Sequence, residues 1–369
     1  MVSRTLLWMR PLMMALVSIS LISGVVGGLL RAGVPLPAIA AFDWTRQALG
    51  LHSALMICGF LGTVIGIERA VALRAAWAFV VPMATSLGAA CLLVRQYGWG
   101  AALFELAAVV FVLVNAVIVK RQSAQHTWML LLSAVVWLMG TSRFMFVGLS
   151  DSVLSAWFGF LVLTIAAERL EMTRLTKVPA VARMGLWLIV GVMVGSLVVV
   201  PRDSVMGGVL YGLALLSLAV WLGLFDIARR TIRSTGLSRY MAVCLLSGYA
   251  WLAVAGLCWA AYACGWSSRD ASLHALGLGF VLSMVMGHAP VILPAVARVK
   301  LHFDARFYGP LCLLHLSLMA RLLVGPFDER GLRWGSAGNA IAMVYFAATV
   351  ISAAVAWQRQ HPNGRGRRT

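Results

Sequence analysis

Four of the seven histidines lie inside long apolar stretches, where an ionisable side chain is costly and therefore marks a candidate site. They are His52, His274, His288 and His315. A neutral imidazole is a common ligand of haem iron and of copper. These residue types therefore predict a haem or metal site, with hydrogen bonding between helices as the structural alternative.

The order of the apolar stretches sorts these histidines into two layers. His52 and His274 are expected near the outer face of a membrane, on different helices. His288 follows His274 on the same helix and lies roughly 21 Å deeper, on nearly the same helix face. His315 is expected at the depth of His288, and we favour hydrogen bonding for it. We expect His52 and His274 to hold one haem b, or alternatively copper, with His288 as a further metal ligand.

Three apolar stretches share a Gly-Phe pair followed, eight residues after the Phe, by an ionisable residue. The pairs are Gly59-Phe60, Gly159-Phe160 and Gly279-Phe280, and the ionisable residues are Glu68, Glu168 and His288. The spacing predicts three pseudo-repeats of four helices, over residues 1–125, 126–235 and 236–360. Residues at equivalent depth could converge, so Glu68, Glu168 and His288, with His315 as a further candidate, would form an inner proton relay or metal site. The alternative is an ion-pair belt, because Arg69 and Arg169 follow the two glutamates.

Arg143 lies in the outer half of a predicted helix, and Glu105 lies at similar depth on the preceding one. We expect Arg143 to contact a haem propionate or to pair with Glu105. The remaining histidines, His126, His302 and His361, fall in predicted cytoplasmic segments, where they should be solvated.

The elements that position these residues follow from composition. The chain of 369 residues is 62% hydrophobic and 11% charged, with a mean hydropathy of +0.91. Soluble domains have about a quarter of their residues charged, so this chain must place its apolar surface in lipid. Long unbroken apolar runs exclude the alternation of a barrel. We predict an all-α membrane protein with about twelve spanning helices, over residues 11–30, 51–72, 77–94, 101–119, 128–148, 152–172, 185–200, 205–226, 241–263, 271–296, 308–325 and 337–357.

The net charge of +18 is an orientation signal rather than a nucleic-acid footprint. Most of the 30 Lys and Arg fall in short gaps that share one side when both termini are cytoplasmic. The basic tail, with Arg365, Arg367 and Arg368, is expected to contact anionic headgroups. We expect the N-terminal segment to remain as the first helix rather than to be cleaved as a signal peptide.

Several common motifs are missing from the sequence. It contains no Walker loop, GxGxxG, HExxH, CxxCH or CxxC. Nucleotide-driven transport, zinc proteolysis and covalent c-type haem therefore find no support.

The segments around His52 and His274 resemble the NnrS family of membrane proteins. That family pairs an early His-x-His-Glu-Met-x-x-Gly-Phe segment with a later His-Ala-Leu helix. This chain keeps His52, Met56, Gly59 and Phe60 of the first, and His274-Ala275-Leu276, Gly279 and Met284 of the second. Ala54 and Leu55 stand where the family has its second His and its Glu.

The resemblance implies a haem- and copper-containing protein linked to nitric oxide metabolism. It also implies an architecture like subunit I of haem–copper oxidases, with twelve helices and a haem held by helices 2 and 10. Helices 6 and 7 contain no histidine here, so an oxygen-reducing binuclear centre is not expected.

These features lead to a haem b protein of the bacterial inner membrane that acts in nitric oxide metabolism or response, or in electron transfer. Its partners would be the lipid bilayer and a quinone or small redox partner, with no nucleic acid. Two alternatives stay open: a quinol-linked oxidoreductase with haem in both layers, and a cofactor-free, proton-coupled transporter.

Overall fold

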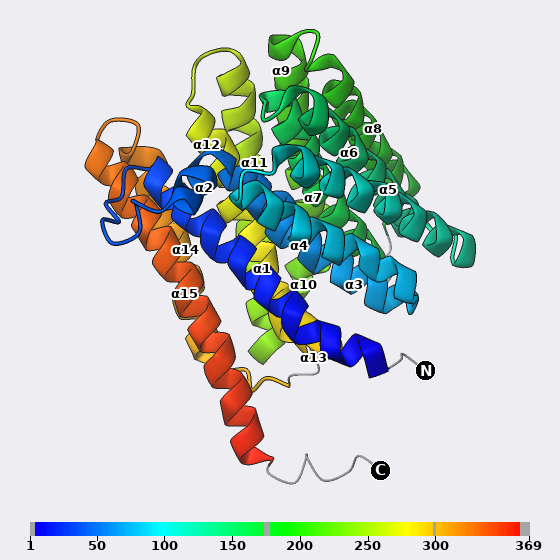
Figure 1. Ribbon diagram of the computed structural model, residues 1–369. Helices are drawn as coiled ribbons and strands as arrows, with labels where there is room; N and C mark the ends of the chain where they lie inside the picture. The colour runs from blue at the N-terminus through cyan, green and yellow to red at the C-terminus, as the bar shows by residue number, and fades with distance from the viewer. Residues whose placement is uncertain (1–3, 173–177, 298–299, 362–369) are drawn as a thin grey trace. The chain divides into compact units, whose positions relative to one another are not determined.

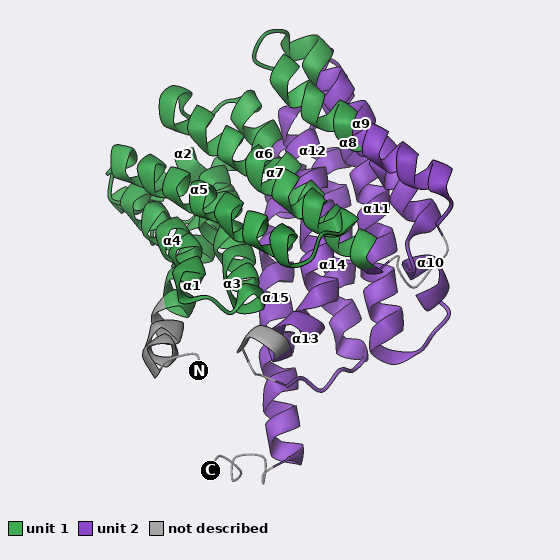
Figure 2. Cartoon of the chain, turned by 90° about the vertical axis from the view of Figure 1, so that its right-hand side faces the viewer, with its two compact units in different colours: residues 1–171, 190–207 green, residues 172–189, 208–369 purple. Residues whose placement is uncertain are grey.

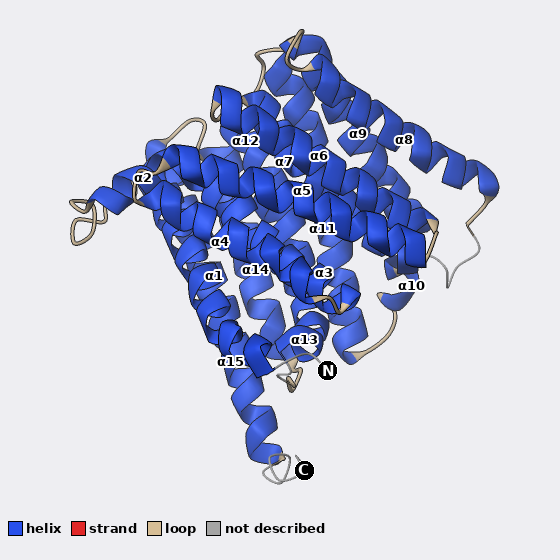
Figure 3. Cartoon of the chain, turned by 45° about the vertical axis from the view of Figure 1, so that its right-hand side comes forward, coloured by secondary structure: helices blue, strands red, loops and turns tan. Residues whose placement is uncertain are grey.

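The computed structural model describes residues 4–172, 178–297 and 300–361, and over these ranges the chain forms helices joined by short loops, without a strand (Figure 1, Figure 3). Within the same ranges, twelve continuous helical stretches are long and apolar enough to cross a membrane. The chain is thus an all-α, multi-pass membrane protein, as its composition predicts. The basic tail lies outside the described residues.

The chain divides into two compact units (Figure 2). Unit 1 comprises Met1–Glu171 and Val190–Gly207, and unit 2 comprises Met172–Ile189 and Gly208–Thr369. The boundaries between the units fall near the end of α7 (Asp151–Met172) and within α8 (Ala180–Val199) and α9 (Ser204–Phe225). Each unit has its own buried core and its own candidate histidine.

The helices of unit 1 run in sequence order with short connections. They are α1 (Arg4–Arg31), α2 (Asp43–Ala54), the π-helical η1 (Leu55–Gly62), α3 (Thr63–Leu73), the 3₁₀ turn η2 (Ala76–Phe79), α4 (Val80–Leu93), α5 (Tyr97–Arg121), α6 (Gln125–Val147) and α7 (Asp151–Met172). The stretch from α2 through η1 to α3 is one continuous span.

The helices of unit 2 repeat this pattern of long spans. The chain passes through α8 (Ala180–Val199) and α9 (Ser204–Phe225), which are each divided between the two units, and the short α10 (Ala228–Thr231). It continues with α11 (Gly236–Ala263), α12 (Arg269–His274), the π-helical η4 (Ala275–Leu282), α13 (Ser283–Ala297), the 3₁₀ turn η5 (Ala305–Phe307), α14 (Tyr308–Met319), the π-helical η6 (Ala320–Val324) and α15 (Glu329–Gln360).

Two predicted helix boundaries differ from the structure near histidines. The second span begins at Asp43 rather than at residue 51, because a polar first turn with an acidic residue favours a helix N-terminus. His52 therefore lies well inside its helix. The helix α6 begins at Gln125 rather than at residue 128 and so includes His126. His126 is only 5% exposed and lies 3.8 Å from Glu171, so its predicted solvation is wrong.

Aromatic rings from three helices form the core of unit 1. Trp137 of α6 stacks on Phe160 of α7 with ring centroids 4.8 Å apart. Phe111 of α5 meets both rings edge-on, at 5.4 and 5.9 Å. All three side chains are fully buried. Large rings packed edge to face stabilise a core beyond the area they bury. The Phe of the second Gly-Phe pair is therefore a core residue.

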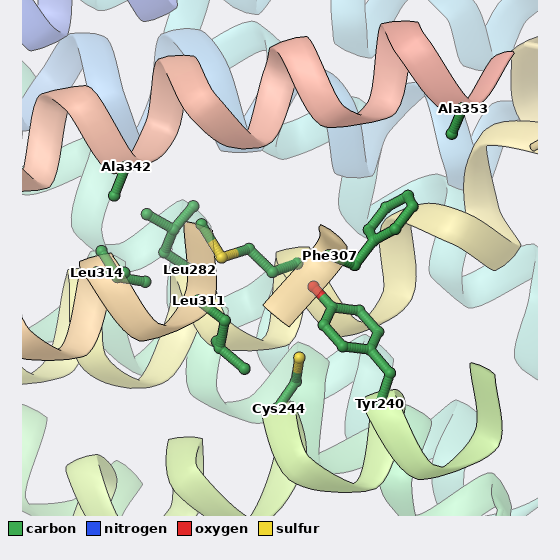
Figure 4. Packing of buried hydrophobic residues seen from close by; sticks show 9 residues of the cluster. Tyr240, Cys244, Leu282, Phe307, Leu311, Leu314, Ala342 and Ala353 are labelled. Atoms are coloured by element: carbon green, nitrogen blue, oxygen red, sulfur yellow. The ribbon is translucent and has the colours of Figure 1, made fainter. Parts of the chain in front are cut away.

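The core of unit 2 joins α11, α13, α14 and α15 (Figure 4). Tyr240 and Cys244 contribute from α11, and Leu311 and Leu314 from α14. Small side chains on α15, among them Ala342, let that long helix approach closely. His288 on α13 and His315 on α14 thus lie on helices that this core holds together.

An even number of spans places both termini on the same side of the membrane. We predict that this side is the cytoplasm, because most Lys and Arg then lie inside. A C-terminal reporter fusion should be active only as a cytoplasmic reporter. A reporter inserted between α1 and α2 should show the opposite side. A C-terminus exposed outside would refute the orientation.

Candidate functional site

His52 is held in one orientation by helix α1. Its Nδ1 lies 2.6 Å from the backbone carbonyl oxygen of Gly24. A carbonyl can only accept, so Nδ1 must carry the proton and donate to it. Nε2 then carries the ring's lone pair, which is the form of imidazole that coordinates iron.

Glycines on α1 make room for this histidine. A Cβ at Gly28 would lie 2.7 Å from Cε1 of His52, and a Cβ at Gly24 would lie 2.6 Å from the sulfur of Met56. Small residues let membrane helices approach closely. The G-x-x-x-G spacing of α1 therefore allows the span that carries His52 to pack closely against α1.

His274 in unit 2 is part of a charged network. Its Nδ1 lies 3.0 Å from the backbone carbonyl of Asp270, one turn earlier in α12, and 3.0 Å from Oδ1 of the same residue. Arg321 of η6 donates to both carboxylate oxygens of Asp270, at 2.9 and 2.6 Å. The Arg321 side chain is almost fully buried.

This arrangement suits a ligand histidine. A carboxylate on Nδ1 orients the ring and makes Nε2 a better donor to a metal. The bidentate arginine neutralises the carboxylate and fixes its plane, so that a charge can persist in the membrane. Sequence reasoning alone does not pair Asp270 with Arg321, because the two residues are 51 positions apart. A rare acidic residue four positions before an intramembrane histidine was the available signal.

Both histidines predicted to hold the haem precede a π-helical segment, a rare geometry that often marks functional sites. His52 lies three residues before η1, and His274 immediately before η4. Arg321 lies within the third segment, η6. The candidate residues of both units are thus placed where a span departs from regular α-helical geometry.

The two histidine spans share a further detail. The Thr63 hydroxyl donates to the Gly59 carbonyl at 2.6 Å, and the Ser283 hydroxyl donates to the Gly279 carbonyl at 2.6 Å. Both glycines are the fifth residue of their π segment. Hydroxyls can satisfy carbonyls where the regular hydrogen-bond ladder is disturbed.

The third Gly-Phe pair lacks this feature. Gly159 lies in α7, which is regular throughout, and Leu163 takes the place of the hydroxyl. Only the second and tenth predicted helices, which carry His52 and His274, therefore share the π-helical segment and the hydroxyl. Three equivalent repeats stay a prediction.

The inner histidines of unit 2 have local hydrogen bonds. Nδ1 of His288 lies 2.6 Å from the Met284 carbonyl of its own helix. Trp251 donates to Nδ1 of His315 at 3.0 Å, so Nε2 of His315 is the donor to Ser247, at 3.1 Å. Both ring nitrogens of His315 are thus engaged, which is structural hydrogen bonding between α14 and α11.

Glu68 and Glu168 converge in unit 1 on a single arginine. Nη2 of Arg69 lies 2.7 Å from Oε1 of Glu68 and 3.0 Å from Oε1 of Glu168. The three side chains are largely buried, and Arg69 joins α3 to α7. His288 belongs to unit 2, so its membership of this inner cluster stays a prediction.

Arg143 and Glu105 have other partners than each other. Arg143 donates to the backbone carbonyls of Ser152, at 3.2 Å, and Leu197, at 2.9 Å. Oε1 of Glu105 accepts from the Ser142 hydroxyl at 2.7 Å. Arg143 thus ties α6 to the start of α7 and the end of α8.

Joint ligation by His52 and His274 stays a prediction of the sequence, because the two residues belong to different units. Among the residues that the structure describes, no group of three or more His, Cys, Asp or Glu could hold a metal ion. The copper alternative likewise stays a prediction.

The ion pair behind His274 should contribute to stability. Arg321→Gln leaves the Asp270 carboxylate without its main donors, which should cost about 1–3 kcal/mol. Thermal unfolding in detergent measures this loss. Arg333→Gln breaks an exposed i,i+4 pair with Glu329 on α15 and should cost under about 0.5 kcal/mol. Equal effects of the two substitutions would contradict the assigned role of Arg321.

Residues 10–355 match a protein family described as "Domain of unknown function (DUF8744)". Comparison with curated proteins and with solved structures finds no match. The matched range contains His52, Asp270, His274 and Arg321 together with nearly all of the helical spans. The chain belongs to the DUF8744 family.

Proposed function

We propose that this chain is a haem b protein of the bacterial inner membrane, with both termini cytoplasmic, that acts in nitric oxide metabolism or response, or in electron transfer. The observation that carries the proposal is the Arg321–Asp270–His274 network in unit 2. The resemblance to the NnrS family supplies the link to nitric oxide.

The donor chemistry of the described residues fits a haem. His274 has its Nδ1 on a carboxylate, and His52 has its Nδ1 on a backbone carbonyl. Both rings therefore present Nε2 as the coordinating nitrogen. His274 would hold the haem, and His52 is the second ligand that the sequence predicts. A bound haem b would supply one-electron chemistry and a binding position for a small gas if one ligand is labile.

Asp270 and Arg321 are positioning residues in this proposal. The carboxylate holds the imidazole plane and increases electron donation through Nε2, which lowers the reduction potential of a ligated iron. Arg143 already donates to two backbone carbonyls, which favours its structural role over contact with a propionate.

The alternatives draw on unit 1 and on the inner layer. A cofactor-free, proton-coupled transporter is favoured by the Glu68–Arg69–Glu168 cluster, in which one guanidinium serves two carboxylates. A quinol-linked enzyme with a second haem in the inner layer is less favoured, because hydrogen bonds engage both nitrogens of His315.

Substitution of the candidate ligands separates these functions. The purified protein should show a haem b spectrum, and His274→Ala or His52→Ala should abolish its low-spin Soret band. His361→Ala, at an exposed position near the C-terminus, is the matched control and should retain full haem content. A folded wild-type protein without haem after expression with ample haem supply would leave the transporter as the better proposal.

The positioning role of Asp270 has its own readout. Asp270→Asn keeps a hydrogen-bond acceptor for His274 but removes the charge. We expect it to retain haem and to raise the midpoint potential, measured by redox titration of the α band. An unchanged potential would show that the carboxylate does not act on the iron through His274.

A further inference from the structure

A groove runs along the C-terminal part of α15, and its chemistry is independent of the haem proposal. It encloses about 670 Å³ and is lined by two arginines, Arg306 of η5 and Arg359 of α15. Between them its lining is mainly apolar, with Ile351 and Val355 of α15. Ile351 is 63% exposed, so an occupant would find an accessible apolar wall.

Other residues place this groove at a membrane interface. Lys300 lies 5.1 Å from the ring of Trp357, two residues before Arg359 in α15. Trp with a basic partner at a helix end is typical of the headgroup level. The span that contains α14 begins at Ala305, and the last span ends at Gln360, so both arginines lie at span ends. The apolar wall continues along α15 toward Val344, which is 70% exposed.

The charge at the groove is net positive. Asp304 accepts from Nε and Nη2 of Arg306, at 2.9 and 2.5 Å, and this hydrogen bond holds the pKa of the Asp304 carboxyl below its usual range. Asp304 is therefore ionised at neutral pH and orients Arg306. With Arg359, the groove has two cations beside one carboxylate. This excess of positive charge favours an anion at headgroup level, next to an apolar surface on which acyl chains can pack.

We propose that this groove binds an anionic phospholipid, with its phosphate at Arg306 and Arg359 and its acyl chains along Ile351, Val355 and Val344. Two arginines from different elements can hold one phosphate, because guanidinium groups match phosphate oxygens in geometry and charge. The proposal does not depend on whether the chain binds haem.

The test uses the full chain in detergent, titrated with phosphatidylglycerol or phosphatidylcholine and followed by native mass spectrometry. We expect phosphatidylglycerol to be retained preferentially. Arg359→Gln should weaken its apparent affinity about fivefold, and the double variant with Arg306→Gln by more than tenfold. Arg330→Gln, which removes one charge at the other end of α15, should leave the affinity unchanged.

Two results would overturn the proposal. One is equal retention of phosphatidylglycerol by the wild type and the Arg359→Gln variant, which keeps Arg306 and its ion pair intact. The other is displacement of the bound lipid by inorganic phosphate at modest excess, which would assign the arginines to a free anion. Haem content, measured on the same samples, should be identical in all variants and keeps this test separate from that of the proposed function.

Discussion

The structure depends on one constraint: inside a bilayer there is no water, so each polar group must find its partner within the protein. Helices satisfy the backbone within each span. The side chains that remain polar are then tied to carbonyls or to one another. His52 donates to a carbonyl of α1, Asp270 lies between an arginine and a histidine, and Arg69 serves two glutamates. The candidate site residues are therefore defined by their partners as much as by their own chemistry.

The same constraint explains why side-chain hydroxyls accompany two of the π-helical segments. A wider turn shifts the backbone ladder and leaves a carbonyl poorly satisfied, which is costly in lipid. Thr63 and Ser283 donate to the carbonyls at these turns in the two histidine spans. The adjoining glycines are packed against side chains of neighbouring helices, Ala89 and Trp251, so each wider turn is held by close packing. In both units, a departure from regular helical geometry is thus held by close packing beside a histidine.

Rigidity of the imidazole rings connects this packing with the proposed function. A ligand histidine must keep both its tautomer and its ring plane, because Nε2 is useful only when it points steadily toward the iron. The Gly24 carbonyl does this for His52, and the Asp270 carboxylate does it for His274. His315 is equally rigid, but its hydrogen bonds use both nitrogens and leave it a structural role. Three intramembrane histidines that look alike in sequence thus have different hydrogen-bond partners.

Composition and apolar run length determined the helical class and the number of spans, because the thickness of a bilayer sets the length of apolar sequence that a span needs. They also singled out His52, His274, Glu68 and Glu168, since ionisable residues are conspicuous in apolar runs. The starts of helices were harder to predict from the sequence, because a polar first turn such as that of α2 gives no hydropathy signal.

Only the tertiary structure decided what each polar residue contacts. Arg321 and Asp270 are 51 positions apart, and His52 and Gly24 are 28 apart. Nothing in the local sequence around one member of such a pair specifies the other. The burial of His126 and the double hydrogen bonding of His315 likewise depend on neighbouring helices. Hydropathy is a local property of the chain, whereas a hydrogen-bond partner is chosen by the packing of distant helices. Sequence alone could therefore place residues along each span but could not show which of them meet.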